Sequence, residues 1–171
     1  MNGVPPTRYN VTPVTADIVP VTAKLSFDSS LNVVDKSFDI NAANILAENP
    51  VGSASYARLQ NQGTSVAFVN DPEMNAMGLF NANTNDVTVN MALHSSPEEA
   101  ASTIVHEATH QNGFFNGIPQ ITQYTEYQAF RNESLFQNGV RPSLDERLNI
   151  WNDFQSLCPD LPQGKYPFGG S

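Results

Sequence analysis

Residues 96–113, SPEEAASTIVHEATHQNG, decide the fold of this chain, because they specify a helix that carries ionisable side chains. Ser96 is a good N-cap, Pro97 suits the first helical position, and Glu99 stands where it can complete a capping box. Gly113 stands where a helix end is expected. Apolar residues cover most of the surface in between: Ala100, Ala101, Ile104, Val105 and Ala108. Such a helix is buried, so we expect it at the centre of the fold.

Residues 106–110, HEATH, have the form H-E-x-x-H. On a helix, positions i and i+4 share one face, so His106 and His110 can reach one metal ion. Glu107 points close to the same side, where it can take a proton from a metal-activated water. Leaving these groups unpaired on a buried helix would be costly, which favours a bound metal over chance occurrence of the motif.

A candidate third ligand follows on a second predicted helix. Residues 111–121 contain two glycines and one proline and are predicted to form a loop. The next helix begins at Thr122 or Thr125, runs to Asn138 and ends at Gly139. Spacings of three and four residues place four of its side chains on one face: Glu126, Ala129, Phe130 and Glu133. Two histidines and one carboxylate, with a fourth position left to water, form a catalytic zinc set and not a closed structural one.

The segment 101–136 resembles the gluzincin group of zinc metallopeptidases, which combine an HExxH helix with a glutamate on a following helix. The run EYQAF, which starts at Glu126, is similar to the E-x-x-A helix of small single-domain bacterial metallopeptidases, several of which are toxin or effector domains. The resemblance covers about a fifth of the chain. It implies one Zn²⁺ per chain on His106, His110 and Glu126, with Glu107 as the catalytic general base.

Three departures from related zinc peptidases bear on the ligand set. Glu126 follows His110 by sixteen residues, which is short for thermolysin-like enzymes, so Glu133 remains the alternative metal ligand. No histidine follows His110, which disfavours the metzincin pattern. The aspzincin pattern needs an aspartate soon after the second histidine, and the next one is Asp145.

The remaining pattern predicts an α+β, zincin-like fold with a small mixed or antiparallel sheet packed on the central HExxH helix. The chain is predicted to form a single domain, 1–171, with 1–25 as an extended N-terminal arm and 160–171 as a C-terminal tail. Its further predicted elements are a strand within 19–27, helices at 38–48 and 53–62, a strand at 64–70, a hairpin of 77–80 and 86–91, and a helix that starts after Ser143 and is ended by Pro159.

The second hairpin strand is a candidate for substrate docking. Val87, Val89 and Met91 alternate with polar or small residues, which predicts one buried face. By resemblance to zincins, 88–92 would form the sheet edge along which a peptide adds as an extra strand, with Thr88, Asn90 and Ala92 as its residues. The alternative is an internal strand.

Three side chains of the second predicted helix region are candidates for stabilising the transition state. Tyr124, Tyr127 and Arg131 lie close to Glu126 in sequence, and a Tyr hydroxyl or a guanidinium could hold an oxyanion. Their alternative roles are helix packing and surface charge.

Composition excludes several other classes of protein. The chain has 171 residues with 40% hydrophobic and 15% charged content, which is typical of one globular domain. Its net charge of −9 argues against nucleic acid as a partner. One cysteine, Cys158, excludes an intramolecular disulfide. We expect a soluble protein with no membrane span and no recognisable signal peptide, so its localisation is unknown and any secretion would follow a non-classical route.

These observations predict a zinc metalloendopeptidase that hydrolyses peptide bonds of a protein or peptide substrate through a zinc-activated water. A bacterial toxin or effector role would imply an immunity or inhibitor protein as partner. Two alternatives remain open. One is a catalytically inactive zincin-like binding module, and the other is a structural component of a larger secreted assembly whose histidines are core residues.

Overall fold

The computed structural model describes residues 25–27 and 33–168. Its elements, in order, are β1 (Leu25–Phe27), α1 (Val33–Glu48), α2 (Pro50–Asn61), β2 (Ser65–Val69), β3 (Gly78–Asn81), β4 (Asp86–Asn90), a 3₁₀ turn (Met91–Leu93), α3 (Pro97–Phe115), α4 (Gln123–Asn138) and α5 (Leu144–Leu157). This arrangement confirms the α+β class. The predicted arm 1–25 lies outside the described residues, apart from Leu25 at the start of β1.

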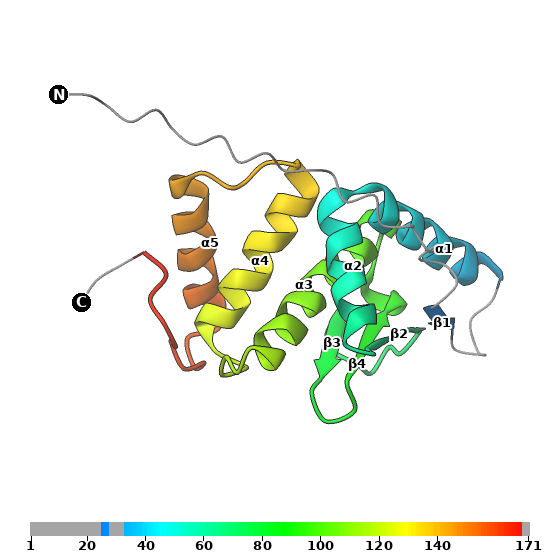
Figure 1. The fold of residues 1–171 in the computed structure, drawn as a ribbon, viewed down its shortest axis with the longest axis horizontal. Helices are drawn as coiled ribbons and strands as arrows, with labels where there is room; N and C mark the ends of the chain where they lie inside the picture. Colours follow the sequence, from blue (N-terminus) through cyan, green and yellow to red (C-terminus); the bar gives the residue numbers. More distant parts are fainter. Residues whose placement is uncertain (1–24, 28–32, 169–171) are drawn as a thin grey trace.

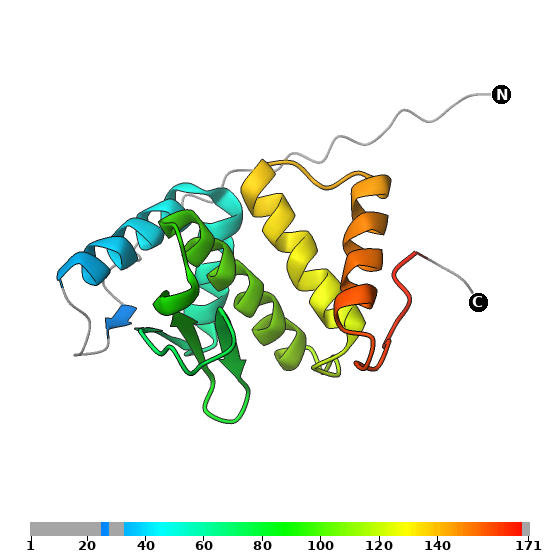
Figure 2. The same cartoon turned by 180° about the vertical axis from the view of Figure 1, so that it is seen from behind.

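Within the described residues, the strands form one mixed sheet in the order β1-β2-β4-β3. β2 pairs in parallel with both β1 and β4, whereas β3 pairs antiparallel with β4. The predicted hairpin is therefore confirmed, and β3 forms one outer edge of the sheet. Figure 2 shows the hairpin projecting beyond the helices.

Helix α3 lies at the centre of the fold, with α1 and α2 on one side and α4 on the other (Figure 1). It also contacts β3 and β4. The alternation of β2 and β4 turns Val66, Phe68, Val87 and Val89 into the core, where each is fully buried. Ile104 and Val105 of α3 are fully buried in the same cluster. The prediction of a central, buried HExxH helix is confirmed.

The helix ends follow their capping residues. Ser96 Oγ accepts a hydrogen bond from the Glu99 amide, and the Glu99 carboxylate accepts one from the Ser95 amide at 2.7 Å. Thr122 caps α4, which ends at Gly139 in the left-handed region at φ 69°. The predicted second helix is thus confirmed at both ends.

Other predicted boundaries were wrong. Gly113 does not end α3, which continues to Phe115, because the left-handed residue that terminates it is Gly117 at φ 71°. The helix predicted at 53–62 begins earlier, at Pro50, because Asn49 Oδ1 accepts hydrogen bonds from the amides of residues 51 and 52. The first helix also begins at residue 33, before the predicted start at 38.

The C-terminal segment after α5 packs against the start of α4. The Gln123 amide donates to the Pro162 carbonyl at 2.9 Å, and the ring of Phe168 lies 5.7 Å from that of Tyr127. Contacts of residues 162–168 therefore help to hold the first turn of α4. Among the helices of the described chain, none combines the length and apolar character that crossing a membrane requires.

Gly78 sets the distance between β3 and α3. A Cβ at this position would lie 2.4 Å from Thr103 Cγ2 and 3.1 Å from Glu107 Cγ. Only glycine therefore lets the edge strand approach the central helix this closely.

We predict that Gly78→Ala lowers the free energy of unfolding by about 1–3 kcal/mol, because the added methyl group overpacks the contact between β3 and α3. Chemical denaturation measures this change. Gly113→Ala is the control, since its new methyl group would meet mainly the flexible end of Gln120 in a helical position. Equal stability of Gly78→Ala and the parent would contradict the packing role.

Candidate metal centre

Three predicted ligands converge between α3 and α4. His106 and His110 lie one turn apart on α3, and their Nε2 atoms are 3.1 Å apart. Glu126, in the first turn of α4, places one carboxylate oxygen 3.3 Å from His106 Nε2 and the other 3.4 Å from His110 Nε2. Within the described residues, these three side chains form the group of His, Cys, Asp or Glu that could hold a metal ion.

The spacing of these atoms fits a small cation with short bonds. In a tetrahedral site with bonds of about 2.0–2.1 Å, ligand atoms lie about 3.3 Å from one another. The two Nε2 atoms, 3.1 Å apart, are close to that separation, and each of them lies 3.3–3.4 Å from a different oxygen of Glu126. The exposed fractions of the side chains are 14% for His106, 12% for His110 and 21% for Glu126, so the group remains open to solvent on one side.

Glu133 lies on the other side of the His106 ring. Its carboxylate contacts Nδ1 of His106, whereas the metal-facing atom is Nε2. Ser102 Oγ donates to the same carboxylate at 3.2 Å, and Gln137 Nε2 donates to Ser102 Oγ at 3.1 Å. The alternative prediction of Glu133 as third ligand thus gives way to Glu126. Glu133 instead holds the orientation and tautomer of His106.

Glu107 is buried against the edge strand. Its Oε2 accepts a hydrogen bond from the Phe80 amide at 2.8 Å, and only 7% of the residue is exposed. Burial raises the pKa of Glu107, against the opposing charges of His106 and His110. A carboxylate with a raised pKa is a stronger base, which suits proton transfer.

The two carboxylates around His106 change its proton affinity. Burial lowers the pKa of His106, but hydrogen bonds with Glu126 and Glu133 outweigh burial and raise that pKa to about 10. Burial raises the pKa of Glu126, whereas hydrogen bonds with His106 and His110 lower it to about 2. Without a metal ion, a proton on His106 therefore satisfies these carboxylates.

A cavity of about 490 Å³ opens over the four site residues His106, Glu107, His110 and Glu126. β3 and its turn, residues 78–83, line this cavity, and so do Gln120 and Ile121 of the loop before α4. Ile121 is 69% exposed and has φ of 58°, a conformation that is strained for a β-branched residue. The loop thus holds an apolar side chain at the cavity rim at a cost in backbone energy.

The predicted oxyanion residues do not line this cavity. Tyr127 is 1% exposed and packs against Trp151 and Phe168. Tyr124 and Arg131 line a separate, smaller cavity that reaches His110 from the loop side. Tyr124 and Arg131 therefore share a cavity with His110 but not with Glu107, and Tyr127 is buried in the packing of the helices.

The predicted docking edge at Thr88, Asn90 and Ala92 was wrong. β4 lies between β2 and β3, so its backbone groups are already paired on both sides. Asn90 is fully buried, and its side chain bonds the backbone of Asp71. Ala92 lies beyond the strand, in the 3₁₀ turn. The edge that faces the metal centre is β3.

Several site features had no clear signal in the sequence. The Phe80 amide is a backbone group, and the role of Gly78 depends on a close approach that only the folded chain shows. Gln120 and Ile121 belong to a loop whose course follows from the packing of α3 on α4. Glu133 did have a signal, because it lies two turns after Glu126 on the same face of α4.

Comparisons with known proteins gave no match to a protein-family model, to a curated protein or to a solved structure.

We predict that Glu133→Gln weakens metal binding about 10-fold or more, because a neutral amide is a poorer acceptor for the His106 Nδ1 proton. Competition with a chromophoric chelator measures the dissociation constant. Glu98→Gln removes the same charge from an exposed position in the first turn of α3 and should leave affinity unchanged. Equal metal affinities of the two variants would show that Glu133 does not support metal binding.

We also predict that metal binding at pH 8 releases about one proton from His106, because its raised pKa keeps it protonated in metal-free protein. Glu126, with its lowered pKa, is already ionised and releases none. Calorimetric titration in buffers of different ionisation enthalpy counts the protons. A binding enthalpy independent of the buffer would contradict this protonation state.

Proposed function

We propose that this protein is a zinc-dependent metalloendopeptidase of the gluzincin type. The observation that carries the proposal is the open group of His106, His110 and Glu126, whose possible ligand atoms lie within 4.8 Å of one another, next to the buried carboxylate of Glu107. A structural zinc site uses four protein ligands, whereas a catalytic one keeps a position for water or substrate. Three possible ligands that line a cavity of about 490 Å³ support the catalytic kind.

The donor set favours zinc over other biological cations. Mg²⁺ and Ca²⁺ prefer six or more oxygen ligands, and two imidazoles do not meet that preference. Imidazole nitrogen with one carboxylate oxygen suits Zn²⁺ and its short tetrahedral bonds. When bound, the ion would supply a Lewis acid that makes water more acidic and polarises a carbonyl group.

The residues of this chain would handle the protons. Glu107 takes a proton from the attacking water while the water oxygen bonds to the carbonyl carbon of the peptide. The C–N bond then breaks, and Glu107 delivers the proton to the amine nitrogen that leaves. The Phe80 amide holds one oxygen of Glu107 at 2.8 Å and so orients the carboxylate for this exchange. Glu133 keeps His106 in position throughout.

The free edge of β3 would bind the substrate main chain. The Asn90 amide donates to the Met77 carbonyl, so Met77 lies at a hydrogen-bonded position of the antiparallel pair. Because such positions alternate along a strand, the backbone groups of Gly78 and Phe80 face away from β4. The Phe80 amide already donates to Glu107, so a peptide would pair with the Gly78 amide and carbonyl and with the Phe80 carbonyl. An extended peptide could pair with this edge and lie across the metal centre. Main-chain pairing would provide affinity with little dependence on sequence.

A bacterial toxin or effector role, with an immunity or inhibitor protein as partner, stays a prediction of the sequence resemblance. The non-enzymatic alternatives make different predictions. A binding module would hold zinc without cleaving any protein, and a structural component would hold no stoichiometric metal.

We predict that Glu107→Gln keeps one zinc per chain and loses hydrolysis by at least about 100-fold, because it removes only the base. Glu126→Ala should lose zinc and activity together. Elemental mass spectrometry counts the metal, and cleavage of unfolded casein reports turnover. Hydrolysis of casein by Glu107→Gln would contradict the role of Glu107 as the general base. Zinc without casein cleavage in the parent would favour the binding module, and absence of zinc would favour the structural component.

A further inference from the structure

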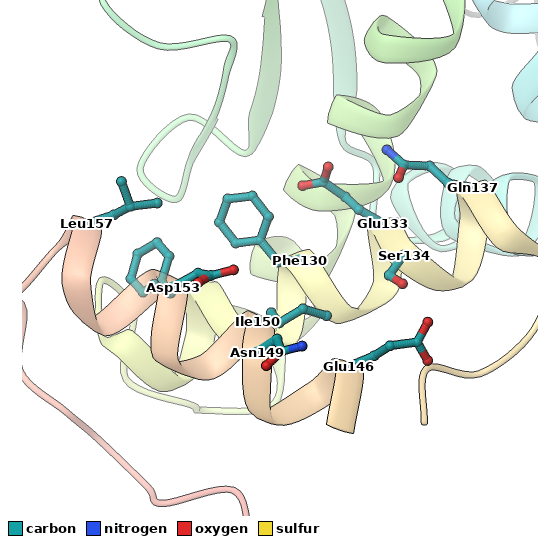
Figure 3. Close-up of a pocket in the computed structure, with 10 residues that line it drawn as sticks. Phe130, Glu133, Ser134, Gln137, Glu146, Asn149, Ile150, Asp153 and Leu157 are labelled. Atoms are coloured by element: carbon teal, nitrogen blue, oxygen red, sulfur yellow. The ribbon is translucent and has the colours of Figure 1, made fainter. Parts of the chain in front are cut away.

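A second cavity, of about 540 Å³, lies between α4 and α5, and we call it the α4–α5 groove (Figure 3). Apolar side chains form much of its wall: Phe130, Phe154 and Leu157. Its charged lining is entirely acidic: Glu133, Glu146 and Asp153. No basic side chain of the described residues lines it. A groove with apolar walls and only negative charges favours an occupant that is both apolar and cationic.

The groove adjoins the metal centre through two residues of α4 that contact His106. The ring of Phe130 meets the His106 imidazole edge to face, with centroids 4.9 Å apart. Glu133 contacts Nδ1 of the same imidazole. The α4–α5 groove would therefore lie next to a peptide held at the metal, on the side of His106.

One carboxylate of the groove remains available to a ligand. The Glu133 carboxylate is hydrogen-bonded to His106 and Ser102. The Glu146 carboxylate accepts a hydrogen bond from the Ser143 amide at 2.6 Å in the capping box of α5. The carboxylate of Asp153 has no hydrogen bond or ion pair with any described residue, and in Figure 3 it is directed from α5 toward α4. Leu157, 74% exposed, extends the apolar wall one turn further along α5.

We propose that the α4–α5 groove binds a lysine or arginine side chain of the substrate, with the aliphatic stem against Phe130 and Phe154 and the cationic head at Asp153. The inference rests on the proposed peptidase function and narrows its substrate to chains with a basic residue near the scissile bond. Lysine and arginine combine a long apolar stem with a terminal positive charge. The apolar walls of the groove suit the stem, and the Asp153 carboxylate suits the charge. The net charge of −9 would also draw basic segments toward the site.

The test uses peptides that differ at a single scanned position, with lysine, arginine or the uncharged norleucine within three residues of the scissile bond. Fluorescence anisotropy measures their binding to the zinc-loaded Glu107→Gln full chain, and cleavage by the parent gives kcat/KM. We expect at one position a preference of about 5-fold for the basic peptides over norleucine, which is typical of one partly exposed charge pair. High salt should reduce the preference.

Asp153→Asn should bring the preference to about 1, because it removes the charge and keeps the shape. Asp145→Asn, on the same helix but outside the groove, is the matched control and should keep the preference. A preference that survives Asp153→Asn, or cleavage with no preference for basic residues, would overturn the groove assignment. A preference in binding without cleavage by the parent would support the groove and overturn the peptidase function instead.

Discussion

The burial of ionisable side chains on one side of α3 is the constraint on which the rest of the structure depends. α3 is enclosed by helices and strands, yet it carries two imidazoles and a carboxylate in its middle turns. Such groups are expensive to bury unless partners or a metal ion satisfy them. α4 provides those partners from two of its turns, since Glu126 faces the Nε2 atoms and Glu133 faces Nδ1 of His106. The packing of α4 on α3 is therefore also the assembly of the site.

The same constraint shapes the cavity above the site. β3 must come close to α3 for the Phe80 amide to reach Glu107, and Gly78 allows that approach. The loop from α3 to α4, which also lines the cavity, is held in a conformation that is strained at Ile121. Backbone strain persists where the surrounding structure enforces it, and it is found most often at functional sites. The cleft is thus lined by a strand edge and a strained loop together with the candidate metal ligands.

The roles of the glutamates follow from which nitrogen of His106 each one meets. Both Glu126 and Glu133 lie on one face of α4, and neither spacing nor residue type distinguishes them. A carboxylate beside Nε2 lies among the atoms that could bind a metal ion, whereas one beside Nδ1 can only orient the ring. The chain of Gln137, Ser102 and Glu133 then links the orientation of His106 to the interior of the α3–α4 interface. Asp153, on α5 beside this part of the site, has a carboxylate without a hydrogen-bond or ion-pair partner among the described residues.

The sequence by itself determined the features that depend on local spacing. Helical periodicity placed His106, Glu107 and His110 on one side of a capped, buried helix, and alternation at Val87 and Val89 marked a strand with one buried face. It also put Glu126 and Glu133 on a common face of the next helix. Strand order, however, depends on pairing between distant segments, and only the tertiary structure showed that β3 and not β4 is the free edge. Likewise, the burial of Tyr127 and the different positions of Glu126 and Glu133 around His106 follow from how α4 packs on α3 and α5. Local propensity carries no information about such contacts, because they are formed by residues far apart in the chain.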